Sequence, residues 1–338
     1  MQTNHRVVVG DAGDLPLDSD AVELVVTSPP YPMIEMWDET FTGQDPRIGT
    51  ALEAGDGQRA FDLMHELLAD AWGEIARVLV PGGIAAVNVG DATRTVGGEF
   101  RSYPNHARIL AALEAAGLDP LPDVLWRKPT NSAAKFMGSG MLPPNAYVTL
   151  EHEFVLLARK PGMRSPDSER RHQSAYFWEE RNEWFSDVWA FRGERQAVET
   201  GPRERTGAFP FELPYRVINM YSVHGDTVLD PFLGTATTTL AAMASARSSI
   251  GVEIDPALAT QFDPSAAGIV EVGTRRSEER LRAHEQFVAE RDEEPGYDAT
   301  HYDTKVVTKQ ERDIRLPTVE SVTARPDGWQ VEHDYLQD

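Results

Sequence analysis

A short motif near the N-terminus contains the residue types needed to bind a flat ring that carries an amino group. Ser28-Pro29-Pro30-Tyr31 directly follows the apolar run Val22–Thr27, which predicts a strand. Two consecutive prolines stiffen the backbone and remove two N–H donors, so that carbonyl acceptors remain. A serine hydroxyl and a carbonyl can accept hydrogen bonds from an amine while the tyrosine stacks on the ring. A rigid proline turn without a binding role is the alternative interpretation of this motif alone.

A second motif, around residue 230, has the form of a nucleoside-binding loop. Asp230-Pro231-Phe232-Leu233-Gly234-Thr235 follows a strand-like run and precedes a predicted helix. Glu253 ends the next predicted strand, and an acid about 20 residues after a glycine turn usually binds ribose hydroxyls. The loop has neither a complete G-x-G-x-x-G pattern nor a Walker lysine, which disfavours pyrophosphate and triphosphate ligands. S-adenosylmethionine, a nucleoside without phosphates, is the candidate ligand.

Strands and helices are predicted to alternate along most of the chain. Strands are expected over 6–10, 22–27, 84–89, 123–126, 148–158, 227–229 and 249–253, with helices over 61–79, 105–117, 213–221 and 238–246. This order predicts an α/β fold with an open, mostly parallel, Rossmann-like twisted sheet. Ligands of such sheets bind outside the carboxyl ends of the strands, which is where both motifs fall.

The alternation breaks over residues 129–205, which are rich in glycine, proline, serine, arginine and aromatic residues. We expect an inserted, loop-rich target-recognition region there. It would separate a catalytic half (1–128) from a cofactor-binding half (206–274). Residues 275–338 predict a charged helix followed by a small β-extension, with a turn at Pro326-Asp327-Gly328.

The composition excludes several kinds of chemistry. The 338 residues include no cysteine, which excludes thiol nucleophiles, disulfides and zinc-thiolate sites. The histidines show no metal-ligand spacing, so no metal is expected. A formal charge of −22 with only five lysines favours a halophile's surface, and an ordinary acidic protein is the alternative. No apolar run has the length of a membrane span or signal peptide, so we expect a soluble, cytoplasmic protein without a membrane partner.

The two motifs, in this order, resemble those of the N4-cytosine/N6-adenine DNA methyltransferases in the permuted form that places the catalytic motif first. The resemblance extends over nearly the whole chain. It implies the open-sheet fold of methyltransferases that use S-adenosylmethionine, and double-stranded DNA as substrate. The catalytic residues implied are Ser28, Pro29, Pro30 and Tyr31.

The same resemblance implies the cofactor-binding residues. Asp11 would meet the cofactor adenine, and Glu253 would bind the ribose. Phe209 and Pro210 belong to the segment that closes over the methionine part of the cofactor. The cofactor loop supplies Asp230, Phe232, Gly234 and Thr235. Ala236 stands where the family often has glycine, which is a modest change if its backbone stays at negative φ.

The missing cysteine and Ser28 together indicate which base is modified. Methylation at cytosine C5 in this superfamily needs a thiolate, whereas an exocyclic amine can attack the methyl group directly. The family's N4-cytosine enzymes usually carry serine at the position of Ser28, and its adenine enzymes usually carry Asp or Asn. We therefore favour N4 of cytosine. N6 of adenine is the first alternative, and a methyltransferase for RNA or a small molecule is the second.

The target base must leave the duplex to be modified. Pro32, Met33 and Trp37 are predicted to form the pocket that receives it. The string Tyr31–Asp38 is similar to that of enzymes that modify the palindrome CTAG.

Basic residues equal acidic ones only in the middle of the chain. Residues 92–216 hold 16 acidic and 17 basic residues, against 16 and 4 in residues 1–91. Arginines interleaved with aromatic residues suit phosphate contact and base stacking, and an aromatic core is the alternative. The DNA-contact candidates are Lys128, Lys135, Arg181, Arg192 and Arg195. A cognate restriction endonuclease is a further candidate partner, and the oligomeric state is left open.

Overall fold

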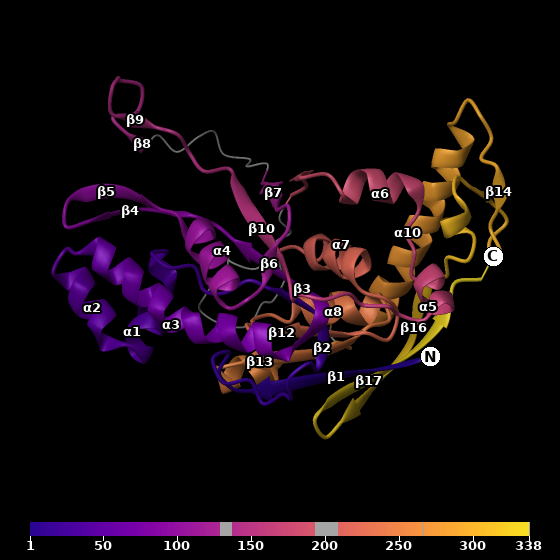
Figure 1. Cartoon of the computed structure of the whole chain (residues 1–338), viewed down its shortest axis with the longest axis horizontal. Helices are drawn as coiled ribbons and strands as arrows, with labels where there is room; N and C mark the ends of the chain where they lie inside the picture. The colour runs from indigo at the N-terminus through magenta and orange to yellow at the C-terminus, as the bar shows by residue number, and fades with distance from the viewer. Residues whose placement is uncertain (129–136, 193–208, 266, 338) are drawn as a thin grey trace.

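A computed structural model describes residues 1–128, 137–192, 209–265 and 267–337. Its centre is an open twisted sheet with helices on both faces (Figure 1), as the α/β prediction requires. Eleven strands of the described residues belong to it, in the order β11-β7-β10-β3-β2-β12-β13-β1-β17-β16, with β6 paired to β10. Their bounds are β1 (Gln2–Val9), β2 (Val22–Thr27), β3 (Leu79–Val89), β6 (Asp119–Pro120), β7 (Val124–Arg127), β10 (His152–Arg159), β11 (Val188–Ala190), β12 (Thr227–Asp230), β13 (Ser248–Glu253), β16 (Pro317–Arg325) and β17 (Gly328–Tyr335).

The middle of the sheet is parallel and its flanks are antiparallel. β3, β2, β12, β13 and β1 run in one direction, while β10 and β17 pair with this block from either side in the opposite direction. β2 and the C-terminal part of β3 are largely apolar and buried, because both faces of the sheet are covered there. In β2, Val25 packs into the core on one face, and Leu24 and Val26 pack into the core on the other.

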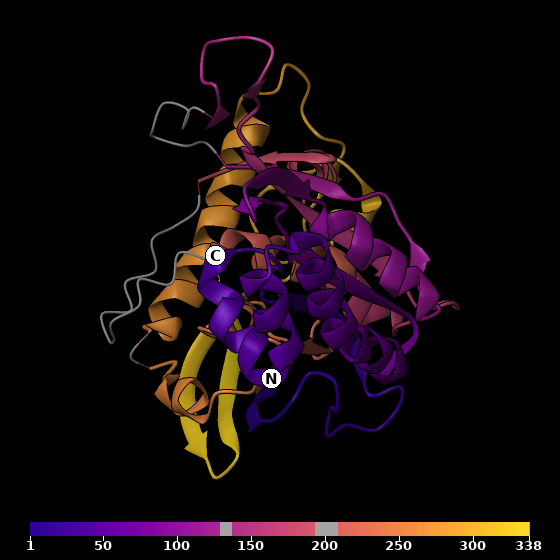
Figure 2. The same ribbon diagram turned by 90° about the vertical axis from the view of Figure 1, so that its left-hand side faces the viewer.

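One group of helices covers each face. The first face carries α1 (Asp38–Gln44), α2 (Pro46–Glu53), α3 (Gly57–Val78) and α4 (Asn105–Ala115). The second carries α7 (Glu212–Tyr221), α8 (Thr237–Ala244) and α10 (Ile269–Ala289). Figure 2 shows α10 along one side of the molecule, near the β16–β17 hairpin. The shorter helices are η1 (Glu35–Trp37), α5 (Ser168–Gln173), α6 (Trp178–Trp184), α9 (Pro256–Gln261) and η2 (Lys309–Glu311).

Three small hairpins lie outside the central sheet. They are β4 (Ala92–Val96) with β5 (Glu99–Tyr103), β8 (Met137–Gly138) with β9 (Ala146–Tyr147), and β14 (Tyr297–Asp298) with β15 (Lys305–Val306). The β8–β9 hairpin projects far from the body of the molecule, beyond β4 and β5 (Figure 1). Within the described ranges, no helix combines the length and apolarity needed to cross a membrane.

The predicted segment boundaries cut through the sheet. β10 and β11 lie within residues 129–205, yet β10 pairs with β3 and β7, and β11 pairs with β7. The C-terminal hairpin turns at Pro326-Asp327 as expected, but β17 pairs with β1 and extends the main sheet. Both pairings satisfy backbone groups that would otherwise form exposed sheet edges.

A buried chain of polar side chains joins β17, β1 and β13. Thr3 Oγ1 lies 2.8 Å from His5 Nε2 and 2.8 Å from His333 Nε2, and His5 Nδ1 lies 2.8 Å from Ser249 Oγ. Burial lowers the pKa of His5 to about 3 and that of His333 to about 4. Both rings are therefore neutral in the folded protein at physiological pH.

These histidines predict an acid-sensitive stability. Because the pKa values of both histidines are lower in the folded state than in the unfolded state, the unfolded chain takes up protons first as the pH falls below about 6.5. Each histidine should then remove about 1.4 kcal/mol of unfolding free energy per pH unit, down to its folded-state pKa. Urea unfolding between pH 7.5 and 5 measures this slope. His333→Gln should have a shallower slope than the wild type, and equal slopes would contradict the assignment.

Candidate functional site

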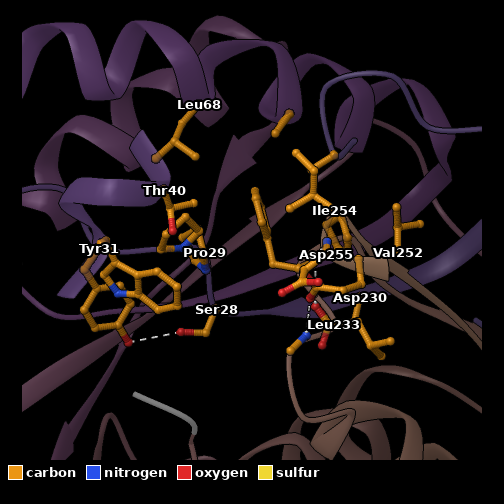
Figure 3. A pocket seen from close by; sticks show the side chains of 18 of the residues that line it. Ser28, Pro29, Tyr31, Thr40, Leu68, Asp230, Leu233, Val252, Ile254 and Asp255 are labelled. Atoms are coloured by element: carbon orange, nitrogen blue, oxygen red, sulfur yellow. Dashed lines mark hydrogen bonds between the residues drawn. The ribbon is translucent and has the colours of Figure 1, made fainter. Parts of the chain in front are cut away.

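One continuous cavity of about 390 Å³ brings the two sequence motifs together. It opens where β1, β2, β12 and β13 end, so the carboxyl ends of four neighbouring parallel strands supply its floor. Figure 3 shows Ser28 and Tyr31 on one side and Asp230 with Asp255 on the other. Of the predicted site residues, its lining includes Asp11, Ser28, Pro29, Pro30, Tyr31, Trp37, Phe209, Asp230, Phe232, Gly234, Thr235 and Glu253.

The catalytic motif is held by a hydrogen-bond network with a defined direction. Asn88 Nδ2, which can only donate, lies 2.8 Å from Tyr31 Oη and 2.7 Å from Glu153 Oε2. Ser28 Oγ donates to Tyr31 Oη at 3.1 Å, and Tyr31 Oη donates to Glu153 Oε2 at 3.0 Å. Because the Ser28 proton points at Tyr31, the lone pairs of Ser28 Oγ remain available to accept from an amine in the cavity.

The electrostatics of the network keep the tyrosine protonated. Burial and the neighbouring carboxylate of Glu153 raise the pKa of Tyr31 well above its ordinary value. Glu153 also accepts a charge-assisted hydrogen bond from Lys128 Nζ. Lys128 Nζ lies 4.6 Å from the centre of the Trp126 ring as well. The network thus runs from Ser28 through a neutral phenol to a carboxylate paired with an ammonium group.

Asp230 is a buried carboxylate at the cofactor loop. It is 3% exposed, and its Oδ1 accepts from Thr27 Oγ1 at 2.6 Å and from the N–H of Phe232 at 3.1 Å. Burial raises its pKa to about 6, although these hydrogen bonds act in the opposite direction. Hydrogen bonds, and no cation, are the main influences that oppose the effect of burial on this pKa. A buried carboxylate without a cationic partner suits a ligand that carries positive charge.

Glu253 fixes the shape of the cofactor loop. Its two carboxylate oxygens accept from the backbone N–H groups of Gly234 at 2.9 Å and Asp255 at 3.0 Å. Its own carbonyl accepts from the N–H of Gly10, which places Asp11 beside it. These two acids therefore border the same part of the cavity, from two adjacent parallel strands.

The backbone at Ala236 differs from the expectation. Its φ is +62°, in the left-handed region, whereas a negative φ was the condition for tolerating alanine. The residue immediately precedes α8, where the chain turns from the loop into the helix, and its side chain is fully buried. A left-handed alanine costs roughly 1–2 kcal/mol, so the surrounding packing must offset this cost.

Of the three residues predicted for the base pocket, only Trp37 lines the cavity. Trp37 lines the cavity, together with Ile34 and Met36. Met33 is instead 1% exposed and belongs to the core, because its φ of +66° turns the chain and its N–H contacts Met64 Sδ at 3.3 Å. Pro32 is also buried and absent from the lining.

The remaining predicted residues occupy varied environments. Pro210 is buried next to Phe209 but does not line the cavity. Arg181 on α6 and Arg192 after β11 are exposed. Lys135 and Arg195 lie outside the described residues. Lys128, expected to contact DNA, has its ammonium group paired with Glu153, so its described contact is within the site.

No sequence pattern singled out Glu153, because its place in the site depends on the pairing of β10 with β3. That pairing sets Val155 opposite Asn88 and brings Glu153 near Tyr31. Asn88 lies near the end of β3. Its hydrogen bonds to Tyr31 and Glu153 assign it to the site.

The cavity fits S-adenosylmethionine by its donor and acceptor set. Asp11 and Glu253 offer acceptors to a nucleoside, Phe209 and Phe232 offer aromatic surface, and Asp230 offers a buried negative charge. When bound, this cofactor supplies a methyl group on a positively charged sulfur.

Comparison with known proteins agrees with this geometry. Residues 22–263 match the N6/N4 methyltransferase family, described as DNA methylase. The type II methyltransferase M.MthZI of Methanothermobacter thermautotrophicus is 46% identical over 324 residues, which cover 94% of this chain and 91% of that protein. The type II methyltransferase M.MjaI of Methanocaldococcus jannaschii is 47% identical over 272 residues, covering 76% and 89%.

Solved structures show the same fold. TTHA0409 of Thermus thermophilus, in complex with S-adenosyl-L-methionine, has a TM-score of 0.60 and 30% identity, covering 80% of this chain and 93% of that chain. PvuII DNA methyltransferase has a TM-score of 0.51 at 17% identity, covering 81% and 93%, which shows the fold alone. The chain therefore belongs to the N6/N4 DNA methylase family and uses S-adenosylmethionine.

Proposed function

We propose that this protein transfers a methyl group to the exocyclic N4 amine of a cytosine that has left the DNA duplex. The observation that carries the proposal is Ser28, whose hydroxyl proton is directed at Tyr31. The serine oxygen and the Pro29 carbonyl are then the acceptors for the two N–H groups of the amine. Held in this way, the amine lone pair can face the methyl group of the cofactor in line.

The absence of cysteine supports an exocyclic amine over ring carbon C5. No residue of the sequence can supply the thiolate that attack on the ring requires. N6 of adenine is the alternative target, because the same two acceptors could hold its amine. Serine at position 28 favours cytosine, because the N4-cytosine enzymes that the motif resembles usually carry serine there.

The network also provides a route for the proton that the methylated amine must lose. We propose that the amine proton passes to Ser28 Oγ while the serine proton passes to Tyr31 and the tyrosine proton to Glu153. The charges balance, because the amine loses one positive charge and the carboxylate of Glu153 becomes neutral. Lys128 and Asn88 keep Glu153 in place throughout.

The identity of the methylated base is tested by nucleoside mass spectrometry. The protein is incubated with S-adenosylmethionine and a duplex containing CTAG, the sequence suggested by the resemblance of Tyr31–Asp38. We expect N4-methylcytosine, and N6-methyladenine in its place would refute the N4 proposal. Ser28→Ala should lower kcat by about 100-fold or more, because one acceptor for the amine is lost. It should leave cofactor affinity unchanged, and full activity of this variant would refute the mechanism.

Glu153→Gln tests the proton route. The amide cannot take up the proton, so we expect kcat to fall by about 100-fold while KM for DNA and the affinity for the cofactor stay close to wild type. Single-turnover methylation across pH measures the chemical step directly. Glu151→Gln is the matched control, because Glu151 lies two residues earlier with its side chain 47% exposed. Wild-type kcat in Glu153→Gln would exclude the route.

Asp230 predicts a pH dependence of cofactor binding. A positively charged ligand favours the ionised carboxylate, whose pKa is about 6 without the cofactor. The affinity should therefore be full above about pH 7 and fall as the pH drops through 6, by up to about tenfold per pH unit. Isothermal titration calorimetry at pH 7.5 and 5.5 measures it. Asp230→Asn should bind weakly at both values with a flat profile, and an equally steep profile would contradict the assignment.

A further inference from the structure

The tip of the β8–β9 hairpin presents large apolar side chains to solvent. Met141 is 83% exposed and Leu142 71%, and Val148, which follows β9 at the base of the hairpin, is 82% exposed. Clustered exposed apolar residues of this kind mark interaction sites in soluble proteins, because isolated ones are common but groups are costly. The hairpin projects away from the body of the molecule (Figure 1), and the high exposed fractions of Met141 and Leu142 show that they pack into no core.

Two backbone hydrogen bonds support the exposed tip. The N–H of Ser139 donates to the carbonyl of Asn145 at 2.8 Å, and the N–H of Leu142 donates to the carbonyl of Ser139 at 3.3 Å. Pro143 and Pro144 follow directly and restrict the backbone further. At the other end of the hairpin, the Tyr147 ring stacks on Phe100 of β5 with 4.9 Å between ring centres. These contacts support the turn that carries Met141 and Leu142 away from the body of the molecule.

The charge around the hairpin identifies the partner. Residues 124–150 contain no Asp or Glu and form the longest acid-free stretch of a chain whose net charge is −22. The same stretch contains three basic residues, of which Arg127 and Lys128 pair with Glu151 and Glu153, while Lys135 lies outside the described residues. An apolar tip on a segment without acidic residues does not repel phosphates and can enter a base stack, which fits duplex DNA, a polyanion with an apolar interior.

The base of the hairpin is tied to the catalytic network. The N–H of Lys128 donates to the carbonyl of Glu151 at 2.8 Å, and Glu153 follows two residues later on β10. Leu142 precedes Glu151 by nine residues, which span at most about 30 Å. The tip can therefore act on the same duplex whose base occupies the cavity.

We propose that the hairpin inserts Met141 and Leu142 between base pairs beside the target base, filling the stack that the flipped base leaves. Apolar wedges of this type unstack one base step, and the lost stacking is replaced by contacts with the side chains. The proposal rests on methylation of a flipped base in duplex DNA, but not on whether that base is cytosine or adenine.

The test compares two substrates that differ only in the stability of the target base pair. One duplex carries the sequence that the wild-type protein methylates, and the other carries the same strand with a mismatched base opposite the target. We expect Met141→Ser/Leu142→Ser to lose about tenfold or more in kcat/KM on the matched duplex, and less than about threefold on the mismatched one. The mismatch already weakens the pair, so the wedge is no longer needed.

Met163→Ser is the matched control, because Met163 is 88% exposed in a separate loop and should behave as wild type on both substrates. Cofactor affinity and melting temperature should be unchanged in all variants, and the single variant Met141→Ser should show a smaller loss of the same pattern. Equal losses of kcat/KM on both duplexes, or no loss on either, would contradict the proposed insertion. The proposal would also be contradicted if the tip substitutions converted a dimer into monomers and left the ratio of kcat/KM on the matched and mismatched duplexes unchanged. Formation of N6-methyladenine would reject only the proposed base, since the ratio is measured on whichever base is methylated.

Discussion

A buried hydrogen bond between Thr27 and Asp230 fixes the two halves of the active site relative to each other. Thr27 ends β2 and Asp230 ends β12, and the 2.6 Å bond between their side chains joins residues 203 positions apart in the chain. The catalytic motif begins at the next residue after Thr27, and the cofactor loop begins at Asp230 itself. A hydrogen bond to a charged group contributes roughly 1.5–3 kcal/mol. The same hydrogen bond also fixes the positions of the catalytic motif and the cofactor loop relative to each other.

A similar constraint governs the catalytic network, where donors and acceptors leave only one arrangement. Asn88 can only donate to Tyr31, so Tyr31 must use its proton on Glu153 and can accept one further hydrogen bond from Ser28. The direction of every proton follows from an amide nitrogen on β3 and a carboxylate on β10. In the sheet, β3 lies beside β2 and β10 lies beside β3, so the sheet itself positions these groups.

The charge of −22 poses a problem for a protein that acts on DNA. Phosphate attraction is weak when carboxylates dominate the surface. The acid-free stretch 124–150 removes that repulsion near the active site, and the hairpin adds apolar contacts that salt does not screen. Glu153 is a carboxylate close to the DNA side, but its pairing with Lys128 neutralises it. Binding would then depend on stacking and shape more than on ionic contacts.

Local sequence patterns are sufficient to predict the chemistry of this protein, whereas the geometry of the site depends on how distant segments pack. The strands that end at Thr27 and Asp230, the order of the two motifs and the Pro326-Asp327 turn were all predictable, because each depends on neighbouring residues alone. Met33 and Ala236 escaped this reasoning because their left-handed backbones are imposed by packing from distant segments. Glu153 and the place of β17 escaped it because strand pairing joins residues far apart in the chain. Periodicity reveals which face of a strand is buried, but only the folded sheet determines which strand lies beside it.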